Sequence, residues 1–243
     1  MVDAFTVETA HLLGDAMVTM HRLRYRVFVE RQKYDVPTLR GMEWDEFDTP
    51  AAVYMLWRDD RNVAGGVARL VPTTSPYMIK TLWPDLVAKG TLPSAPDTWE
   101  VSRFGVERSL PKAIRNRAIG EMMCACGEFA LRKGIKSLLL VSAPRLITAG
   151  ITAAGWRTQA LGGPRNIGRF RVVAVKTHIS EESLEAARRF HRVSNSILRI
   201  SGEEMVGVTN IPHSKTEESF QVFPPRKWTP GYAAWTSACA GLR

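Results

Sequence analysis

The stretch DTWEVSRFGVER, residues 97–108, alternates like a β-strand, but its central positions are charged or polar. It is followed by apolar residues at helical spacing over 112–133 and by the apolar run KSLLLVSA at 136–143. These two patterns predict an amphipathic helix and a buried strand. The order strand, helix, strand predicts an α/β or α+β fold in which helices cover a sheet.

Side chains of a strand alternate between its two faces, so the strand at about 99–106 presents two sets of residues. Glu100, Ser102 and Phe104 share one face, and Trp99, Val101 and Arg103 share the other. Whichever face packs on the core, either Glu100 or Arg103 is partly buried. Such charged groups cluster at functional sites, so the strand is a candidate site. An edge strand with mixed faces is the alternative.

Outside this unit the chain alternates between helical and strand-like patterns. We expect a helix from residue 11, a hairpin over 51–73, short helices near 78–89 and 144–155, a strand over 168–178 and a helix over 181–193. Beyond residue 199 the pattern becomes irregular and rich in proline. We therefore expect one domain over 1–199, with residues 200–243 as an irregular extension packed on it.

The composition is that of a globular protein, with 243 residues of which 45% are hydrophobic and 23% charged. No apolar run reaches the length of about 18 residues that a membrane span needs. The first residues also lack the pattern of an export signal. Three cysteines have neither metal-like nor paired spacing. We therefore expect a monomer in the reducing cytoplasm, without a metal and without a membrane partner.

Charge is unevenly distributed along the chain, whose net charge is +9. Residues 1–60 are net acidic, whereas residues 103–243 are net basic. This asymmetry suggests two binding surfaces of opposite sign. The basic part could meet nucleic acid, a phosphorylated cofactor or an acidic protein, or could be solvated surface charge. We expect no nucleic-acid partner, because no helix-turn-helix, zinc or RNA-binding signature is present.

A dense acidic cluster occurs in GMEWDEFDTP, residues 41–50. We expect no metal there, because no histidine lies nearby in the sequence. A cationic group opposite Asp45 and Asp48, with Arg24 available for a carboxylate, describes a zwitterionic, amino-acid-like ligand. Solvation of the cluster is the alternative.

Several separated motifs carry a resemblance to a known family. They are Arg24, Phe28, EWDEFD at 43–48, VARLVPT at 67–73, WEVSRF at 99–104 and AAGW at 153–156. In order and spacing, over roughly residues 20–175, the chain resembles the acyl-homoserine-lactone synthases, the autoinducer synthases of bacterial quorum sensing. Tyr34 stands where the family usually has Trp, which keeps an aromatic wall.

The resemblance implies a fold similar to the N-acetyltransferase (GNAT) type, a mixed twisted sheet split into a V and sandwiched by helices. It also implies transfer of an acyl group from acyl carrier protein, or from coenzyme A, to the amine of S-adenosylmethionine. The adduct then lactonises and releases 5'-methylthioadenosine, and no cofactor is bound permanently. A GNAT acyltransferase with another amine acceptor is the alternative enzyme.

The resemblance also assigns roles to individual residues. Catalytic positions are Glu100, Ser102 and Arg103, with Glu100 as the general base for the amine. The S-adenosylmethionine pocket is implied to contain Arg24, Phe28, Tyr34, Asp45, Asp48, Arg69 and Phe104. The acyl pocket is expected to contain Leu138, Leu140, Ser142, Leu146 and Trp156. Plain core packing explains the leucines equally well.

The donor side is expected to be basic. RNRAIG at 115–120 is similar to the phosphate loop of GNAT enzymes, in which backbone N–H groups hold pyrophosphate. The basic residues expected to meet the donor are Arg108, Lys112, Arg115, Arg117 and Lys133. The family as a whole favours acyl carrier protein, and we therefore expect acyl carrier protein as the donor, with coenzyme A thioesters as the alternative. VPTTSPYM, WPDL and LGGP instead resemble members from soil and plant-associated bacteria that accept coenzyme A thioesters with short branched or aromatic acyl groups.

Overall fold

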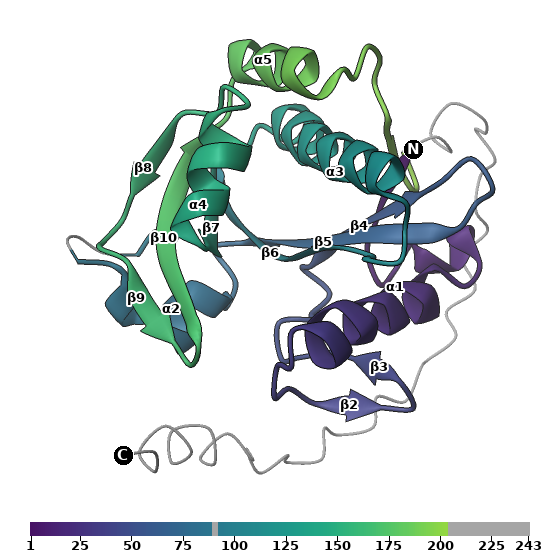
Figure 1. The fold of residues 1–243 in the computed structure, drawn as a ribbon, viewed down its shortest axis with the longest axis horizontal. Helices are drawn as coiled ribbons and strands as arrows, with labels where there is room; N and C mark the ends of the chain where they lie inside the picture. Colours follow the sequence, from purple (N-terminus) through teal and green to yellow (C-terminus); the bar gives the residue numbers. More distant parts are fainter. Residues whose placement is uncertain (89–91, 204–243) are drawn as a thin grey trace, which may run out of the picture. The chain divides into compact units, whose positions relative to one another are not determined.

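The computed structural model describes residues 1–88 and 92–203. In this part nine strands form one mixed sheet in the order β11-β1-β4-β5-β6-β7-β10-β8, and β9 pairs with β10 beside this path (Figure 1). The strands are β1 Val2–Phe5, β4 Val53–Arg58, β5 Ala64–Pro72, β6 Thr98–Val106, β7 Ser137–Ser142, β8 Thr158–Ala160, β9 Arg165–Ile167, β10 Phe170–His178 and β11 Leu198–Ile200. A separate two-stranded ladder joins β2 Thr38–Leu39 to β3 Met42–Glu43.

Helices cover both faces of the sheet. The α-helices are α1 Ala16–Arg24, α2 Met78–Leu82, α3 Lys112–Arg132, α4 Pro144–Leu146 and α5 Glu181–His191. The 3₁₀ segments are η1 Ala10–Leu13 and η3 Pro84–Leu86, and the π-helical segments are η2 Tyr25–Arg31 and η4 Ile147–Thr152. Figure 1 shows α3 and α5 on one side of the sheet and α1 with β2–β3 on the other.

The hydrophobic core therefore has two main layers, one on each face. On one face, α3 packs on the sheet through Met122 and Phe129, and Leu138 of β7 belongs to this layer. On the other face, α1 packs through Met20 and Leu23, and Leu139 belongs to that layer. The neighbours Leu138 and Leu139 thus point in opposite directions, as alternation along a strand requires.

The sheet is split between β6 and β7. These parallel strands pair only at their starts, where Thr98–Glu100 lies beside Ser137–Leu139. Beyond that point β6 continues its ladder with β5, and β7 continues its ladder with β10. The two arms of the sheet therefore diverge from Glu100 and Leu139, which confirms the predicted V-split sheet.

A β-bulge in β6 corrects the predicted faces of this strand. Ser102 pairs with Arg69 and Gly105 with Val67, so β6 has one residue more than β5 over this interval. Arg103 takes up the extra residue with a φ of 52°, a conformation that is uncommon for a residue with a side chain. The bulge turns Arg103 away from the face of Trp99 and Val101. The prediction that these three residues share one face of the strand was therefore wrong, because it assumed regular alternation.

Most of the predicted elements are confirmed. The helix expected over 112–133 is α3, the hairpin over 51–73 is β4–β5, and the strands at 99–106 and 137–142 are β6 and β7. The helix expected from residue 11 is interrupted at Gly14, which has a φ of 62°. The short strands β1 and β11, of which β11 is the edge of the sheet, were not predicted.

The predicted division at residue 199 stays a prediction. Ile200 still belongs to β11 and pairs with Ala4, and residues 204–243 lie outside the described part of the chain. Within residues 1–88 and 92–203, no helix combines the length and the apolar character that crossing a membrane would need.

Candidate active site

Three arginines and three carboxylates form a buried ion cluster on the α1 side of the sheet. Arg24 ends α1, Arg69 lies on β5 and Arg103 lies at the bulge of β6. The loop that begins in β3 contributes Glu43, Asp45 and Asp48. The loop is folded by its own carboxylates, because Asp48 accepts the N–H of Asp45 and Asp45 accepts the N–H of Phe47. We call these six side chains the ion cluster.

Arg24 is completely buried and joins two carboxylates. Its Nε and Nη2 atoms donate to Glu43 at 2.6 and 3.1 Å, and Nη1 and Nη2 donate to Asp48 at 2.6 and 2.9 Å. The remaining N–H of Nη1 points to the sulfur of Met20 at 3.9 Å. All five N–H donors of Arg24 therefore have partners within the protein.

Arg69 and Arg103 complete the ion cluster. Arg69 binds both oxygens of Asp45, reaches Asp48 at 2.8 Å and donates from Nε to the Ser102 hydroxyl at 3.1 Å. Arg103 donates to Glu43 at 3.1 Å and lies 2.6 Å from an oxygen of Asp45. The cluster thus links α1, the acidic loop, β5 and β6, and three positive groups face three negative groups.

The pKa values of two carboxylates of the ion cluster, Asp45 and Asp48, are lowered. Burial alone would raise the pKa of Asp48, but the guanidinium groups of Arg24 and Arg69 hold this pKa well below its usual range. The same balance lowers the pKa of Asp45, where burial is outweighed by Arg69 and Arg103. Pairing with several hydrogen bonds offsets the cost of burying these charges.

Glu100 is the last β6 residue that pairs with β7, and its side chain is only 1% exposed. Its two oxygens accept the N–H groups of Met78 at 2.9 Å and Ile79 at 2.8 Å, at the start of α2. Burial raises the pKa of Glu100 to about 7, although the two N–H groups lower it. A carboxyl group that exchanges its proton near neutral pH therefore lies where the sheet splits.

An aromatic wall lies beside the ion cluster. The rings of Phe28 and Tyr34 stack with their centroids 5.8 Å apart, and the Arg103 guanidinium lies 5.5 Å from the Phe28 ring. Phe170 at the start of β10 meets Tyr34 edge to face at 5.4 Å. Sequence reasoning did not select Phe170. Phe104, which it did select, is 36% exposed and is not part of this wall.

The residues predicted for the acyl pocket lie in different places. Leu138, Leu140 and Ser142 alternate onto the same face of β7, opposite to Leu139. Leu146 is 55% exposed, and Trp156 packs in a separate cluster with Cys124 and Leu184. Of the five residues predicted for the acyl pocket, Leu138, Leu140 and Ser142 therefore lie along one face of β7. Leu146 and Trp156 lie elsewhere.

The residues predicted for the donor side do not form one patch. α3 begins at Lys112, so RNRAIG lies inside the helix and not at its start. Gly120 lies against the ring of His191, where a side chain would clash. Lys133 lies beyond the far end of α3, about 30 Å away at 1.5 Å per residue, and pairs with Glu203. The prediction of a phosphate loop at 115–120 is therefore wrong in position.

A compact basic group does lie near the start of α3. Arg115 donates to the carbonyl of Arg108 at 3.1 Å, and Arg31 donates to the carbonyl of Val106 at 2.9 Å. Burial and the nearby charges of Arg108 and Arg115 lower the pKa of Arg31. Arg117 instead pairs with Asp60 and lies over the Trp57 ring. Arg31 was not selected from the sequence.

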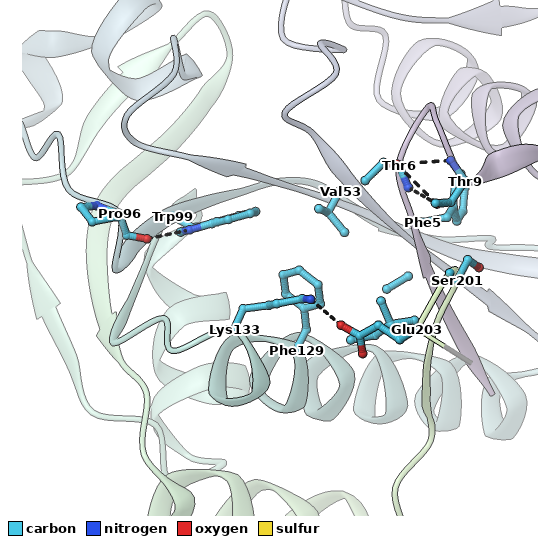
Figure 2. Close-up of a pocket in the computed structure, with 13 residues that line it drawn as sticks. Phe5, Thr6, Thr9, Val53, Pro96, Trp99, Phe129, Lys133, Ser201 and Glu203 are labelled. Carbon is cyan, nitrogen blue, oxygen red and sulfur yellow. Dashed lines mark hydrogen bonds and ion pairs between the residues drawn. The ribbon is translucent and has the colours of Figure 1, made fainter. Parts of the chain in front are cut away.

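A cavity of about 490 Å³ lies on the α3 side of the sheet, between β1, β6, β11 and the end of α3 (Figure 2). Trp99 and Phe129 line it, and the Lys133–Glu203 pair spans its edge. Trp99 and Glu100 are neighbours on β6 but point to opposite faces, so this cavity is separate from the ion cluster. Within residues 1–88 and 92–203, no group of His, Cys, Asp and Glu side chains could hold a metal ion.

The chain matches known proteins in both sequence and structure. The family model "Autoinducer synthase" matches residues 10–187. An acyl-homoserine-lactone synthase of Pseudomonas aeruginosa is 31% identical over 179 residues, 71% of this chain and 85% of that protein. The isovaleryl-homoserine lactone synthase of Bradyrhizobium diazoefficiens is 32% identical over 192 residues, 76% of this chain and 83% of that protein.

Solved structures give the same result. The coenzyme A-dependent acyl-homoserine lactone synthase BjaI superposes with a TM-score of 0.74 and 28% identity, over 83% of this chain and 93% of that one. The synthase LasI superposes with a TM-score of 0.67 and 30% identity, over 77% of this chain and 93% of that one.

The split mixed sheet with helices on both faces defines an acyltransferase of the GNAT-like type. The chain belongs to the autoinducer synthase family, and its function is the synthesis of an acyl-homoserine lactone, the quorum-sensing signal.

Proposed function

We propose that this enzyme transfers an acyl group from a thioester to the amine of S-adenosylmethionine and then closes the lactone, with Glu100 as the general base. In the first step the amine nitrogen bonds to the acyl carbon, the carbon–sulfur bond of the thioester breaks and a thiol leaves. In the second step a carboxylate oxygen of the substrate bonds to the carbon beside the sulfonium. The carbon–sulfur bond there breaks, and neutral 5'-methylthioadenosine leaves.

The position of Glu100 carries this proposal. A general base works best when its pKa lies near the working pH, and burial raises the pKa of Glu100 to about 7. Each Glu100 oxygen accepts one N–H from α2 and keeps a second lone pair for a proton from the amine or from a bridging water.

The split between β6 and β7 supports a meeting of donor and acceptor at Glu100. Past Glu100 and Leu139, the edges of β6 and β7 that face one another make no ladder hydrogen bonds between them. Backbone N–H groups on such edges can stabilise the oxyanion that forms when the thioester is attacked. Glu100 points to the α1 side, whereas Leu138, Leu140 and Ser142 point to the other face. The acceptor and the acyl chain can therefore approach from opposite sides.

The ion cluster is proposed to brace the acceptor pocket. Because every N–H donor of Arg24 is occupied, we infer that this residue holds the acidic loop in place and does not bind the substrate carboxylate directly. Phe28, Tyr34 and Phe170 form the adjoining apolar wall, on which a flat adenine ring or an apolar chain could pack.

We propose a coenzyme A thioester as the acyl donor, with carrier protein as the alternative that the experiment distinguishes. Arg31, Arg108 and Arg115 gather in one compact place, which suits the phosphates of a small donor. Lys133 is too distant to belong to the same contact. The likeness to the coenzyme A-dependent synthases MesI and BjaI, with TM-scores of 0.71 and 0.74, also supports this choice.

Product analysis tests the proposal. The enzyme is incubated with S-adenosylmethionine and matched pairs of coenzyme A and carrier-protein thioesters, and the products are identified by mass spectrometry. An acyl-homoserine lactone together with methylthioadenosine is the expected result, with faster formation from a short branched coenzyme A thioester. An acylated amine without methylthioadenosine would contradict the acceptor, and faster turnover from carrier protein would contradict the donor.

A further inference from the structure

The segment that holds Glu100 is one hydrogen-bonded unit that runs from Met78 through α2 and η3 to Val87. The Trp83 N–H donates to the Ile79 carbonyl at 3.1 Å, and the Leu86 N–H donates to the Trp83 carbonyl at 3.0 Å. Since these bonds connect its two ends, a displacement near Leu86 reaches the N–H groups of Met78 and Ile79.

The far end of this unit lies against the turn that follows β8. The Ala88 N–H donates to the Leu161 carbonyl at 2.9 Å. A Cβ on Gly162 would lie 2.3 Å from the Leu86 carbonyl oxygen and 3.1 Å from the Ala88 nitrogen. The first of these approaches is too short for any side chain, so the contact exists because residue 162 is glycine. Gly163, the next residue, has no atom within 4 Å of the equivalent position.

The turn is anchored to the sheet, so a group added at residue 162 would press against the helical unit. The Leu161 N–H donates to the Ala174 carbonyl on β10 at 2.9 Å, and Ala160 pairs with Val175 in the β8–β10 ladder. Ala174 and Val175 are buried core residues. An atom added at residue 162 therefore pushes on Leu86 and Ala88.

We propose that Gly162 is a positioning residue for the Glu100 carboxylate, because its missing side chain lets the 78–87 unit sit where Met78 and Ile79 donate to Glu100. This inference rests on the proposed function, in which Glu100 is the general base. Gly162 touches neither substrate nor Glu100 and acts only through the helical unit.

The surroundings of Glu100 make its titration a suitable readout. The charged or titratable groups that influence it are Arg69 on β5, Asp45 in the acidic loop and Tyr77 before α2. Residue 162 is not among the hydrogen-bond or ion-pair partners of these three side chains. Hydrogen bonds to a carboxylate favour its ionised form, so weaker bonds from Met78 and Ile79 raise the pKa of Glu100.

The test compares Gly162→Ala with the matched control Gly163→Ala. kcat/KM is measured against pH for the whole enzyme, and thermal unfolding is measured in parallel. For Gly162→Ala we expect the acidic limb of the profile to move to higher pH by at least about half a unit. This shift corresponds to a loss of about threefold in kcat/KM below neutral pH, and kcat/KM should recover at higher pH. The pH profile of Gly163→Ala should superpose on that of the wild type. The substrate amine titrates equally in all cases, so the difference between variants belongs to the enzyme.

A double-mutant cycle adds a second readout. If Gly162 acts through the carboxylate, Gly162→Ala should cause no further loss of rate in a Glu100→Gln background. A lower melting temperature with an unmoved acidic limb would show a purely structural role and overturn the inference. If Gly162→Ala does not fold, Ala88→Pro removes the N–H that Leu161 accepts and should shift the limb in the same direction. An unchanged acidic limb in the pH profile of Ala88→Pro would also contradict the inference.

The role of Glu100 and the role of Gly162 are tested separately. A Glu100→Gln enzyme with the wild-type rate would contradict the proposed function. A Glu100→Gln enzyme that loses activity, together with Gly162→Ala that behaves like Gly163→Ala, would contradict only the role of Gly162.

Discussion

The Oε2 atom of Glu100 accepts the backbone N–H of Met78 at 2.9 Å, so a strand residue is fixed by the first turn of a helix. Ile79 holds the other oxygen in the same way. The carboxylate is therefore held in place before substrate binds, at the point where β6 and β7 separate. A base that is already oriented costs less reorganisation during the reaction.

Glu100→Gln should lower kcat by at least about tenfold and remove the acidic limb from the pH profile of the enzyme. The base must be deprotonated to act, and the pKa of Glu100 is about 7, so the wild-type rate should rise as pH passes through neutrality. Steady-state assays across this range check both effects. A Gln variant with an unchanged rate and profile would remove Glu100 from catalysis.

Glu100 should also affect stability in a pH-dependent way. Its folded-state pKa of about 7 lies above the ordinary value of 4.5, so between these values the folded state binds more protons than the unfolded state. The free energy of unfolding should therefore fall as pH rises from about 5 to about 7. Denaturant titrations should show a smaller fall for Glu100→Gln. Identical slopes would mean that Glu100 has an ordinary pKa.

Arg24→Ala should reduce the free energy of unfolding by about 3–5 kcal/mol, because it leaves Glu43 and Asp48 buried without their partner. Arg26→Ala is the matched control. Arg26 also pairs with a carboxylate, Glu107, but it is exposed, so its loss should cost no more than about 1 kcal/mol. Equal effects in denaturant unfolding would show that the ion cluster does not brace the site.

The same Arg24→Ala variant should weaken S-adenosylmethionine binding more than donor binding. The acidic loop that Arg24 holds lies beside the aromatic wall and not beside the start of α3. Calorimetric titration with each substrate measures the two affinities. A larger loss of affinity for the donor than for S-adenosylmethionine would show that the acceptor pocket does not adjoin the ion cluster.

Reversing the charge of Arg108 and Arg115 together, to Glu, should raise the KM for a coenzyme A thioester by at least about tenfold. Two favourable contacts with phosphate become repulsive, and the effect should shrink as salt rises. Lys133→Glu is the control, since this residue lies near the other end of α3. An equal increase in KM for both variants would indicate a broad electrostatic effect instead of a phosphate site.

The sequence predicted the parts of the fold that depend on local pattern. Helix α3 has a long apolar period, β7 is a continuous apolar run and β6 alternates in character along 99–106, so the positions of these elements could be predicted. β1 and β11 are short strands: β11 forms the edge of the sheet and pairs with β1, which also pairs with β4, and such pairing has no local signal.

The site was predictable to a similar extent. Glu100 could be selected because a carboxylate in a core strand is unusual. The face of Arg103 was predicted wrongly, because the bulge depends on the register with β5. Phe170 was missed because its contact with Tyr34 joins distant parts of the chain. Lys133 was grouped with Arg115 by charge alone, although the helix predicted over 112–133 already places the two residues near its opposite ends.

The product balance of a single reaction tests whether acyl transfer and lactonisation occur on the same substrate. The enzyme is given S-adenosylmethionine and a coenzyme A thioester, and free thiol, acyl-homoserine lactone and methylthioadenosine are quantified over time. Acyl transfer followed by lactonisation predicts equal molar amounts of all three, and Glu100→Gln should slow them together. Release of thiol without a matching amount of lactone and methylthioadenosine would contradict the account.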